Sequence, residues 1–114
     1  MWALIADHIN HCVRKVALGS ASASPVPFVA TVTTFAGKCD AGTGAGHKDG
    51  VGTVARFNFP TGVAFGSDPR YAYVADYTNY RVRMVWMDGS GILEPRLVIT
   101  LVGGATQGLS LIHI

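Results

Sequence analysis

The chain repeats one of its own segments. Residues 3–16 read ALIADHINHCVRKV and residues 72–85 read AYVADYTNYRVRMV, so seven of fourteen positions are identical without a gap, at an offset of 69 residues (76 minus 7 for the two aspartates). A second echo follows, because residues 31–37 (TVTTFAG) resemble residues 97–103 (LVITLVG) at an offset of 66 (100 minus 34). Self-similarity of this kind is typical of repeat architectures, in which a small unit stacks on copies of itself.

Short apolar or alternating runs, separated by turn residues, predict β-strands in the second copy. The expected strands are Thr61–Phe65, Tyr71–Ala75, Tyr80–Met87 and Arg96–Val102, with a tight turn at residues 76–79. No segment shows the sustained i, i+3, i+4 apolar spacing of a capped helix, so we expect very little helix. The sequence therefore predicts an all-β protein whose unit is four antiparallel strands.

The first copy carries the same elements from the second strand onward. Its expected strands are 2–6, 12–17 and 28–35, the last two joined by the small-residue loop GSASASPVP. The glycine-rich stretch between the copies is not expected to form regular secondary structure. We therefore divide the chain into a partial first unit (1–36), a loop between units (37–56), a second unit (57–104) and a non-native or disordered tail (105–114).

The two ends of the chain look unlike natural termini. The last six residues, LSLIHI (109–114), resemble the in-frame translation of the mosaic-end adapter used in transposase-based sequencing libraries. The repeat is already in mid-unit at Trp2, which indicates that Met1 is not the natural N-terminus. Residues derived from an adapter carry no information about the fold.

Composition narrows the class of protein and of partner. Hydrophobic residues make up 49% of the 114 residues and charged residues 14%, which indicates a chain that buries a core. Nine basic residues are scattered against seven acidic ones, so a nucleic-acid partner is not expected. No apolar run reaches the roughly 18 residues of a membrane span. Two cysteines, Cys12 and Cys39, leave both their pairing and the cellular location open.

Four motifs of the second copy point to a family. The runs FPTGVAF (59–65), YVAD (73–76), NYRVRMV (79–85) and TLVGG (100–104), with the lead-in DGVGTVARF (49–57), resemble the NHL repeat. The resemblance covers residues 2–104, about one and three-quarter repeats, and it departs at Cys12, where the second copy has Arg81. It implies an incomplete β-propeller, a ring of four-stranded sheets called blades that pack face to face.

The resemblance also implies a function. NHL propellers mostly bind other proteins, so the expected function is a protein-binding or scaffolding module, and the missing blades are themselves expected partners. The alternative is a propeller enzyme, a lyase or a lactonase-like hydrolase, whose active-site residues lie mostly outside this chain. No catalytic residue and no cofactor is assigned, because no nucleophile or paired-carboxylate arrangement stands out.

Two sets of residues are singled out as candidate sites. The first is the polar set that recurs in both copies and is interpreted as structural, with a loss of about 0.5 to 2 kcal/mol expected when Asp76 or Asn79 is removed. Its members are Asp7, Asn10, Arg14, Asp76, Asn79 and Arg83. The second is a candidate binding loop with Asp40, His47, Lys48 and Asp49. Its two aspartates are interpreted as turn formers, because their spacing does not match an EF-hand loop.

Two sequence patterns resemble a zinc site and a phosphate-binding loop, but the details of each disfavour such a site. His8, His11 and Cys12 form H-x-x-H-C, but the second copy has Tyr77, Tyr80 and Arg81 there, which are not zinc ligands of choice. The glycines of the central loop lack the G-x-G-x-x-G spacing, and no helix follows to bind a phosphate. No metal site is therefore predicted.

Overall fold

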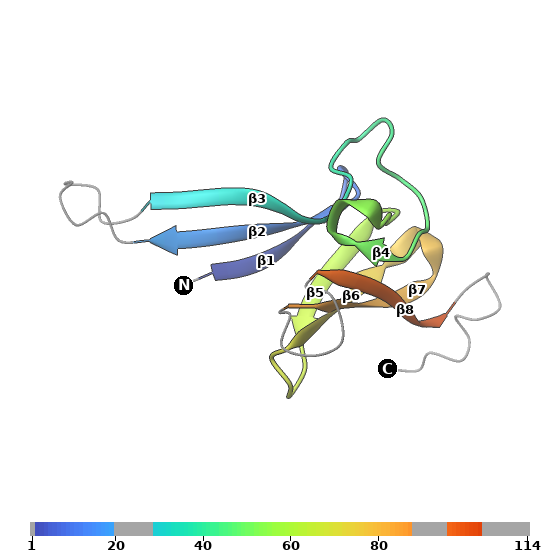
Figure 1. Cartoon of the computed structure of the whole chain (residues 1–114). Helices are drawn as coiled ribbons and strands as arrows, with labels where there is room; N and C mark the ends of the chain where they lie inside the picture. Colours follow the sequence, from blue (N-terminus) through green and yellow to red (C-terminus); the bar gives the residue numbers. More distant parts are fainter. Residues whose placement is uncertain (1, 20–28, 88–95, 104–114) are drawn as a thin grey trace.

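The structure is a computed structural model that describes residues 2–19, 29–87 and 96–103. These residues form two antiparallel sheets, one of three strands in the order β1-β2-β3 and one of five in the order β4-β8-β7-β6-β5 (Figure 1). The predicted all-β class is confirmed. No helix within the described ranges is long and apolar enough to cross a membrane. The loop GSASASPVP beyond Gly19 and the tail 105–114 lie outside the described residues.

The first sheet is a simple meander. Its strands are β1 (Trp2–Asp7), β2 (Cys12–Gly19) and β3 (Val29–Gly37). The ends differ from the expected ones by one or two residues, because backbone pairing continues to Cys12 opposite Gly37 and to Gly19 opposite Val29. Strand ends are thus decided by the neighbouring strand and not by side-chain alternation alone.

The second sheet has one strand more than expected. It contains β4 (Gly50–Val51), β5 (Pro60–Phe65), β6 (Tyr71–Asp76), β7 (Arg81–Trp86) and β8 (Leu97–Gly103). The expected tight turn between β6 and β7 is a short 3-10 helix, η2 (Tyr77–Asn79). The additional strand, β4, pairs with the outer edge of β8.

The prediction that residues 37–56 lack regular secondary structure is wrong for the second half of this stretch. Besides β4 there is a 3-10 turn, η1 (Gly52–Val54). The Gly52 amide donates to the Arg96 carbonyl oxygen at 2.9 Å, and the backbones of Lys48 and Arg56 form a bridge. Gly52 has a φ of 57°, and a Cβ added at this residue would lie only 3.0 Å from the Arg96 guanidinium carbon. Glycine permits this conformation and this close approach, so the glycines here serve a folded segment.

The two copies share the irregularities of their backbones as well as their strands. A left-handed residue ends the turn before β2 in the first copy and before β7 in the second, at His11 (φ 59°) and Tyr80 (φ 54°). A β-bulge follows two residues later, after Val13 and after Val82. Each copy then closes with a glycine of positive φ, Gly37 (89°) and Gly103 (99°). The two copies therefore repeat the same backbone conformation as well as the same sequence.

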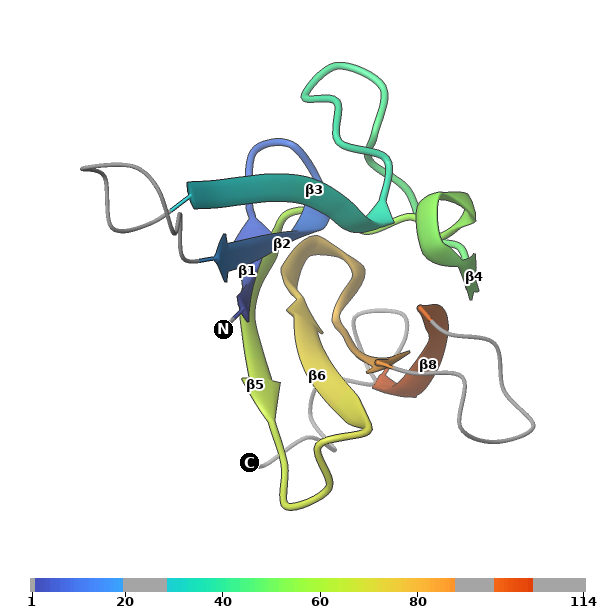
Figure 2. The ribbon, with the colours of Figure 1, turned by 60° about the vertical axis from the view of Figure 1, so that its left-hand side comes forward.

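The two sheets pack on each other through β1 against β5 and β3 against η1 (Figure 2). Buried apolar side chains from both sheets meet there in one cluster, which contains Val13, Phe35, Ala36, Ala55, Phe57, Val74, Val85 and Val98. Burial of valine and phenylalanine side chains is worth about 1.5 to 3 kcal/mol each relative to exposure. The core thus lies between the copies, as stacking of repeated units requires.

Candidate functional site

A disulfide restrains the start of the candidate binding loop, directly after β3. Cys12 and Cys39 form a disulfide that joins residues 27 apart, with their Cα atoms 5.1 Å apart. The Cys12 side of the bond is fully buried on β2. Next to it, the Asp40 amide donates to the Asn10 carbonyl oxygen at 3.1 Å. In the second copy the place of Cys12 is taken by Arg81, which donates to the Asn79 carbonyl oxygen at 3.0 Å.

Asp40 shapes the first turn of the loop. Its carboxylate accepts the amides of Gly42 at 2.8 Å and Thr43 at 3.1 Å, and these hydrogen bonds lower the pKa of the Asp40 carboxyl. The Gly44 amide then donates to the Asp40 carbonyl oxygen at 2.8 Å. A side chain at Gly44 would collide with the Lys38 carbonyl oxygen. The aspartate is used for a local turn, in which one carboxylate oxygen, Oδ1, accepts both backbone amides.

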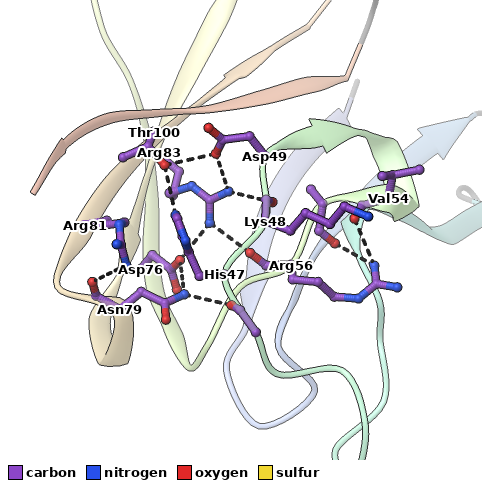
Figure 3. Close-up of polar contacts among 12 residues, drawn as sticks. His47, Lys48, Asp49, Val54, Arg56, Asp76, Asn79, Arg81, Arg83 and Thr100 are labelled. Atoms are coloured by element: carbon purple, nitrogen blue, oxygen red, sulfur yellow. Dashed lines mark hydrogen bonds and ion pairs between the residues drawn. The ribbon is translucent and has the colours of Figure 1, made fainter. Parts of the chain in front are cut away.

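Arg83 holds the other end of the loop (Figure 3). Its side chain is completely buried, and it reaches from β7 to two carboxylates and two carbonyl groups. One nitrogen donates to Asp76 Oδ2 at 2.9 Å and to the Arg56 carbonyl oxygen at 2.8 Å. The other donates to Asp49 Oδ1 and to the Lys48 carbonyl oxygen, both at 2.8 Å. One guanidinium therefore fixes residues 48–56 against the β6–β7 hairpin.

Asp76 and Asn79 complete this attachment from the hairpin itself. Asn79 donates to Asp76 Oδ2 at 2.7 Å and to the Gly46 carbonyl oxygen at 2.8 Å. The other Asp76 oxygen accepts the Asn58 amide at 2.8 Å. Asp76 is fully buried, and both its oxygens have donors, as a buried carboxylate requires. The three recurring residues of the second copy thus lie together and hold the loop.

Thr100 connects the loop to β8 and orders two further side chains. Its hydroxyl donates to Asp49 Oδ1 at 3.0 Å, so its oxygen is left to accept the Nε2 proton of His47 at 3.1 Å. Burial raises the pKa of Asp49, but hydrogen bonds from Thr100 and Arg83 outweigh this and lower it overall. Burial, with the nearby positive charges of Arg81 and Arg83, lowers the pKa of His47.

The first copy builds the same triad, and within the described residues no loop segment is bonded to its side chains. Asn10 donates to both Asp7 oxygens at 3.1 Å. Arg14 donates to Asp7 at 3.2 Å and to the Thr34 hydroxyl at 3.3 Å. The Arg14 and Asp7 side chains are 31% and 29% exposed, in contrast to the fully buried pair of the second copy.

Thr100 contributes a side chain, and Arg56, Gly46 and Asn58 contribute backbone groups, that the sequence reasoning did not single out. Thr100 is identical to Thr34 in the second echo of the repeat, and this identity is the signal that could have marked it. Arg56 contributes its backbone carbonyl to Arg83, a role that leaves no trace in residue type. A backbone contribution of this kind is seen only in three dimensions.

His8, His11 and Cys12 do not gather around one point. The Cys12 sulfur is bonded to Cys39, and the two imidazoles lie against the Phe59 ring with centroids 5.0 Å (His8) and 4.5 Å (His11) away. The Phe59 amide donates to His11 Nδ1 at 3.0 Å, while His8 Nδ1 donates to the Pro60 carbonyl oxygen at 3.2 Å. Across residues 2–19, 29–87 and 96–103 no group of three or more His, Cys, Asp or Glu is placed to hold a metal ion. The two histidines join one sheet to the next.

Most charged groups of the site form hydrogen bonds or ion pairs with one another. The loop that they hold lies on the surface. Thr43, Ala45 and Lys48 are exposed along it. Such an arrangement is suited to recognition, because a loop ordered in advance loses little conformational entropy on binding. Comparison of the chain with protein-family models, with curated proteins and with solved structures finds no match.

Proposed function

We propose that this chain is part of an NHL-type β-propeller that serves as a protein-binding or scaffolding module, and that loop 38–49 is a binding segment. Two stacked antiparallel sheets with the same polar triad, the same bulge and the same closing glycine support the propeller architecture. In such a ring the sheets form a rigid frame, and the connections between them carry recognition.

One observation carries the proposed role of the loop. The loop is fixed at its start by the Cys12–Cys39 disulfide and at its end by the buried Arg83 guanidinium, and its exposed residues lie between these two points. A segment that served only to connect the two sheets would not need a covalent bond and a buried cation to hold it. Bracing at both ends supports recognition of a partner by a loop of defined shape.

A protein partner is favoured over a nucleic acid by the state of the basic side chains. Arg83 is buried, and Arg56 donates to the carbonyl groups of Thr53, Val54 and Ala55. A phosphate backbone is bound by clustered cations that are free to contact it. Among the described basic residues around the loop, these two arginines already bond to groups of the chain itself, so they are not free to contact a phosphate backbone.

The test compares the full chain with a variant in which residues 41–45 are replaced by a glycine-serine segment of equal length that keeps Gly44. Both proteins, with the disulfide formed, are used to capture partners, with nuclease treatment in parallel, and captured proteins are confirmed by direct binding of the purified partner. A partner that binds the natural chain and not the loop variant supports the proposal. Equal binding by both folded proteins would refute the role of the loop, and loss of capture after nuclease treatment would refute the choice of a protein partner.

A further inference from the structure

The disulfide belongs to one copy of the repeat, and the other copy has a different residue in its place. Where the first copy has Cys12, the second has Arg81, with the same left-handed residue before it and the same bulge after it. The strands and turn of a unit therefore reach this shape without a cross-link at this position. What the bond adds is an attachment of the start of loop 38–49 to β2.

The two sulfurs of the bond lie in different surroundings. Cys12 is completely buried on β2, whereas Cys39 is partly exposed at the start of the loop. A thiolate attacks one sulfur of a disulfide and displaces the other, and access is one of the factors that decide which sulfur is attacked. The difference in burial therefore favours attack at Cys39, with the Cys12 sulfur as the leaving group.

A hydrogen-bond donor is directed at the Cys39 sulfur. The Thr34 hydroxyl donates to Cys39 Sγ at 3.3 Å, and its oxygen accepts an N–H of Arg14, also at 3.3 Å. Thr100, the counterpart of Thr34 in the second copy, donates to the carboxylate of Asp49. The same threonine therefore serves an anion in the second copy, and in the first it is placed to stabilise a thiolate at Cys39.

We propose that Cys39 is a thiol-exchange site, at which a low-molecular-weight thiol opens the disulfide of the folded chain and stays attached as a mixed disulfide. The thiolate sulfur bonds to Cys39 Sγ, the bond between the two protein sulfurs breaks, and Cys12 Sγ leaves with the electron pair and takes a proton from solvent. A second thiol then attacks the outer sulfur of the mixed disulfide and releases Cys39 as a thiolate, which Thr34 stabilises. Two thiols are thereby oxidised to one small disulfide, and the protein disulfide is reduced to two thiols.

Opening the bond frees the start of loop 38–49 from its covalent attachment and leaves its end held. The end is still fixed by the buried Arg83 guanidinium, which donates to Asp49. At the start, the Asp40 amide still donates to the Asn10 carbonyl oxygen at 3.1 Å. Exchange at Cys39 thus regulates how firmly the loop is held in one shape. This consequence rests on the proposed binding role of the loop, whereas the exchange itself does not.

The test locates the mixed disulfide. The oxidised full chain is incubated with glutathione at about pH 8, where part of a thiol is ionised, then quenched with acid, alkylated in denaturant and examined by peptide mass spectrometry. The same chain incubated in concentrated urea is the control, because unfolding exposes both sulfurs. We expect at least about tenfold more glutathione on Cys39 than on Cys12 in the folded chain and comparable amounts in urea.

Thr34 is tested as a positioning residue in a chain in which Cys12→Ala leaves Cys39 as a free thiol. Thr34→Val should slow alkylation of Cys39 by about threefold or more at about pH 7 and move the midpoint of its pH profile upward, because the thiolate loses its donor. Thr34→Ser keeps the hydroxyl and should restore the rate. Thr33→Val changes an exposed neighbour on the opposite face of β3 and should leave the rate unchanged.

Equal labelling of both sulfurs in the folded chain, or a folded chain that forms no mixed disulfide, would overturn the exchange site. A pH profile that does not move in Thr34→Val would overturn the role of Thr34. The loop variant at residues 41–45 keeps both cysteines and Thr34, so it should still exchange at Cys39. Selective exchange in a chain whose loop binds no partner would refute the proposed function alone, and partner binding without selective exchange would refute this inference alone.

Discussion

The carboxylate of Asp76 lies 2.9 Å from the guanidinium of Arg83, and neither side chain is exposed to solvent. The corresponding pair of the first copy, Asp7 and Arg14, is 3.2 Å apart and about one third exposed. One motif therefore occurs in two dielectric surroundings within one chain. Removal of one partner is costly for a buried pair and nearly neutral for an exposed one, so the two copies serve as controls for each other.

Asp76→Ala should lower the free energy of unfolding by about 3 kcal/mol, whereas Asp7→Ala should lower it by about 0 to 1 kcal/mol. The first value exceeds the 0.5 to 2 kcal/mol expected from a local turn, because Arg83 is left buried with one carboxylate fewer and the Asn58 amide loses its acceptor. Chemical denaturation of both variants measures the difference. Equal losses would show that the buried pair is no more important than the exposed one.

Reduction of the Cys12–Cys39 bond should destabilise the protein by about 3 to 4 kcal/mol, the value expected for a cross-link that closes a loop of this length. Thermal unfolding with and without a thiol reductant measures the effect. The variant with both cysteines replaced by alanine is the matched control, and its melting temperature should not respond to the reductant. A natural chain that melts at the same temperature in both conditions would contradict the prediction.

Acidification should weaken the loop attachment through His47. The folded-state pKa of His47 is lowered from 6.5, mainly by burial, so the unfolded chain binds this proton more tightly. The contribution of His47 to stability is therefore complete above pH 6.5 and is lost as the pH falls through the lowered pKa. His47→Gln keeps a donor for Thr100 without a titrating group. We expect the stability of the natural chain to fall more steeply than that of this variant between about pH 8 and about pH 5, and parallel curves would argue against it.

Gly103→Ala should cost about 1 to 2 kcal/mol or more, because a side chain there must adopt a left-handed φ and would collide with the Tyr80 carbonyl oxygen. Gly62→Ala is the matched control, since its Cβ would enter open space. That change should be neutral or stabilising by up to about 1 kcal/mol. Denaturation curves of the two variants decide the matter, and a loss of stability only in the Gly62 variant would disprove the role of the closing glycine.

Zinc should not bind stoichiometrically to the oxidised chain. In the structure His11 Nδ1 accepts a backbone amide, His8 Nδ1 donates to the Pro60 carbonyl oxygen, and the Cys12 sulfur is in a disulfide, so all three H-x-x-H-C groups already have partners. Calorimetric titration with zinc is the measurement, with His8→Ala as the control. A tight one-to-one site that disappears in His8→Ala would contradict this assignment.

The strands were predictable from sequence because their signals are local. Alternation of apolar residues and the turn residues between them indicated β5 to β8 to within one or two residues of their ends. The two-residue strand β4 escaped prediction, because its formation depends on pairing with β8, nearly fifty residues away. Glycine-rich composition indicates freedom of the backbone and does not reveal a distant partner that restricts it.

The two Asp-Asn-Arg triads were visible in the sequence as identical residues, but the difference in burial between them was not. Asp76 and Arg83 are buried because residues 48–56 lie over them, and no feature of the triad itself encodes this cover. The disulfide was equally hidden, since a spacing of 27 residues does not determine whether Cys12 and Cys39 meet. The partners of His8 and His11 depend on how two sheets dock, which local sequence patterns do not report.

The contacts of the two histidines with Phe59 and Pro60 also bear on the order in which the chain folds. Apart from β4, each sheet pairs strands that follow one another in sequence, so β1-β2-β3 and β5-β6-β7-β8 can form over short chain loops. His11 and Phe59 are 48 residues apart, and His8 and Pro60 are 52 apart, so their meeting closes a much longer loop. We therefore expect the hairpins to form early and the junction between the sheets to form last. The disulfide shortens the loop that remains to be closed, and its formation before docking would hasten the final step.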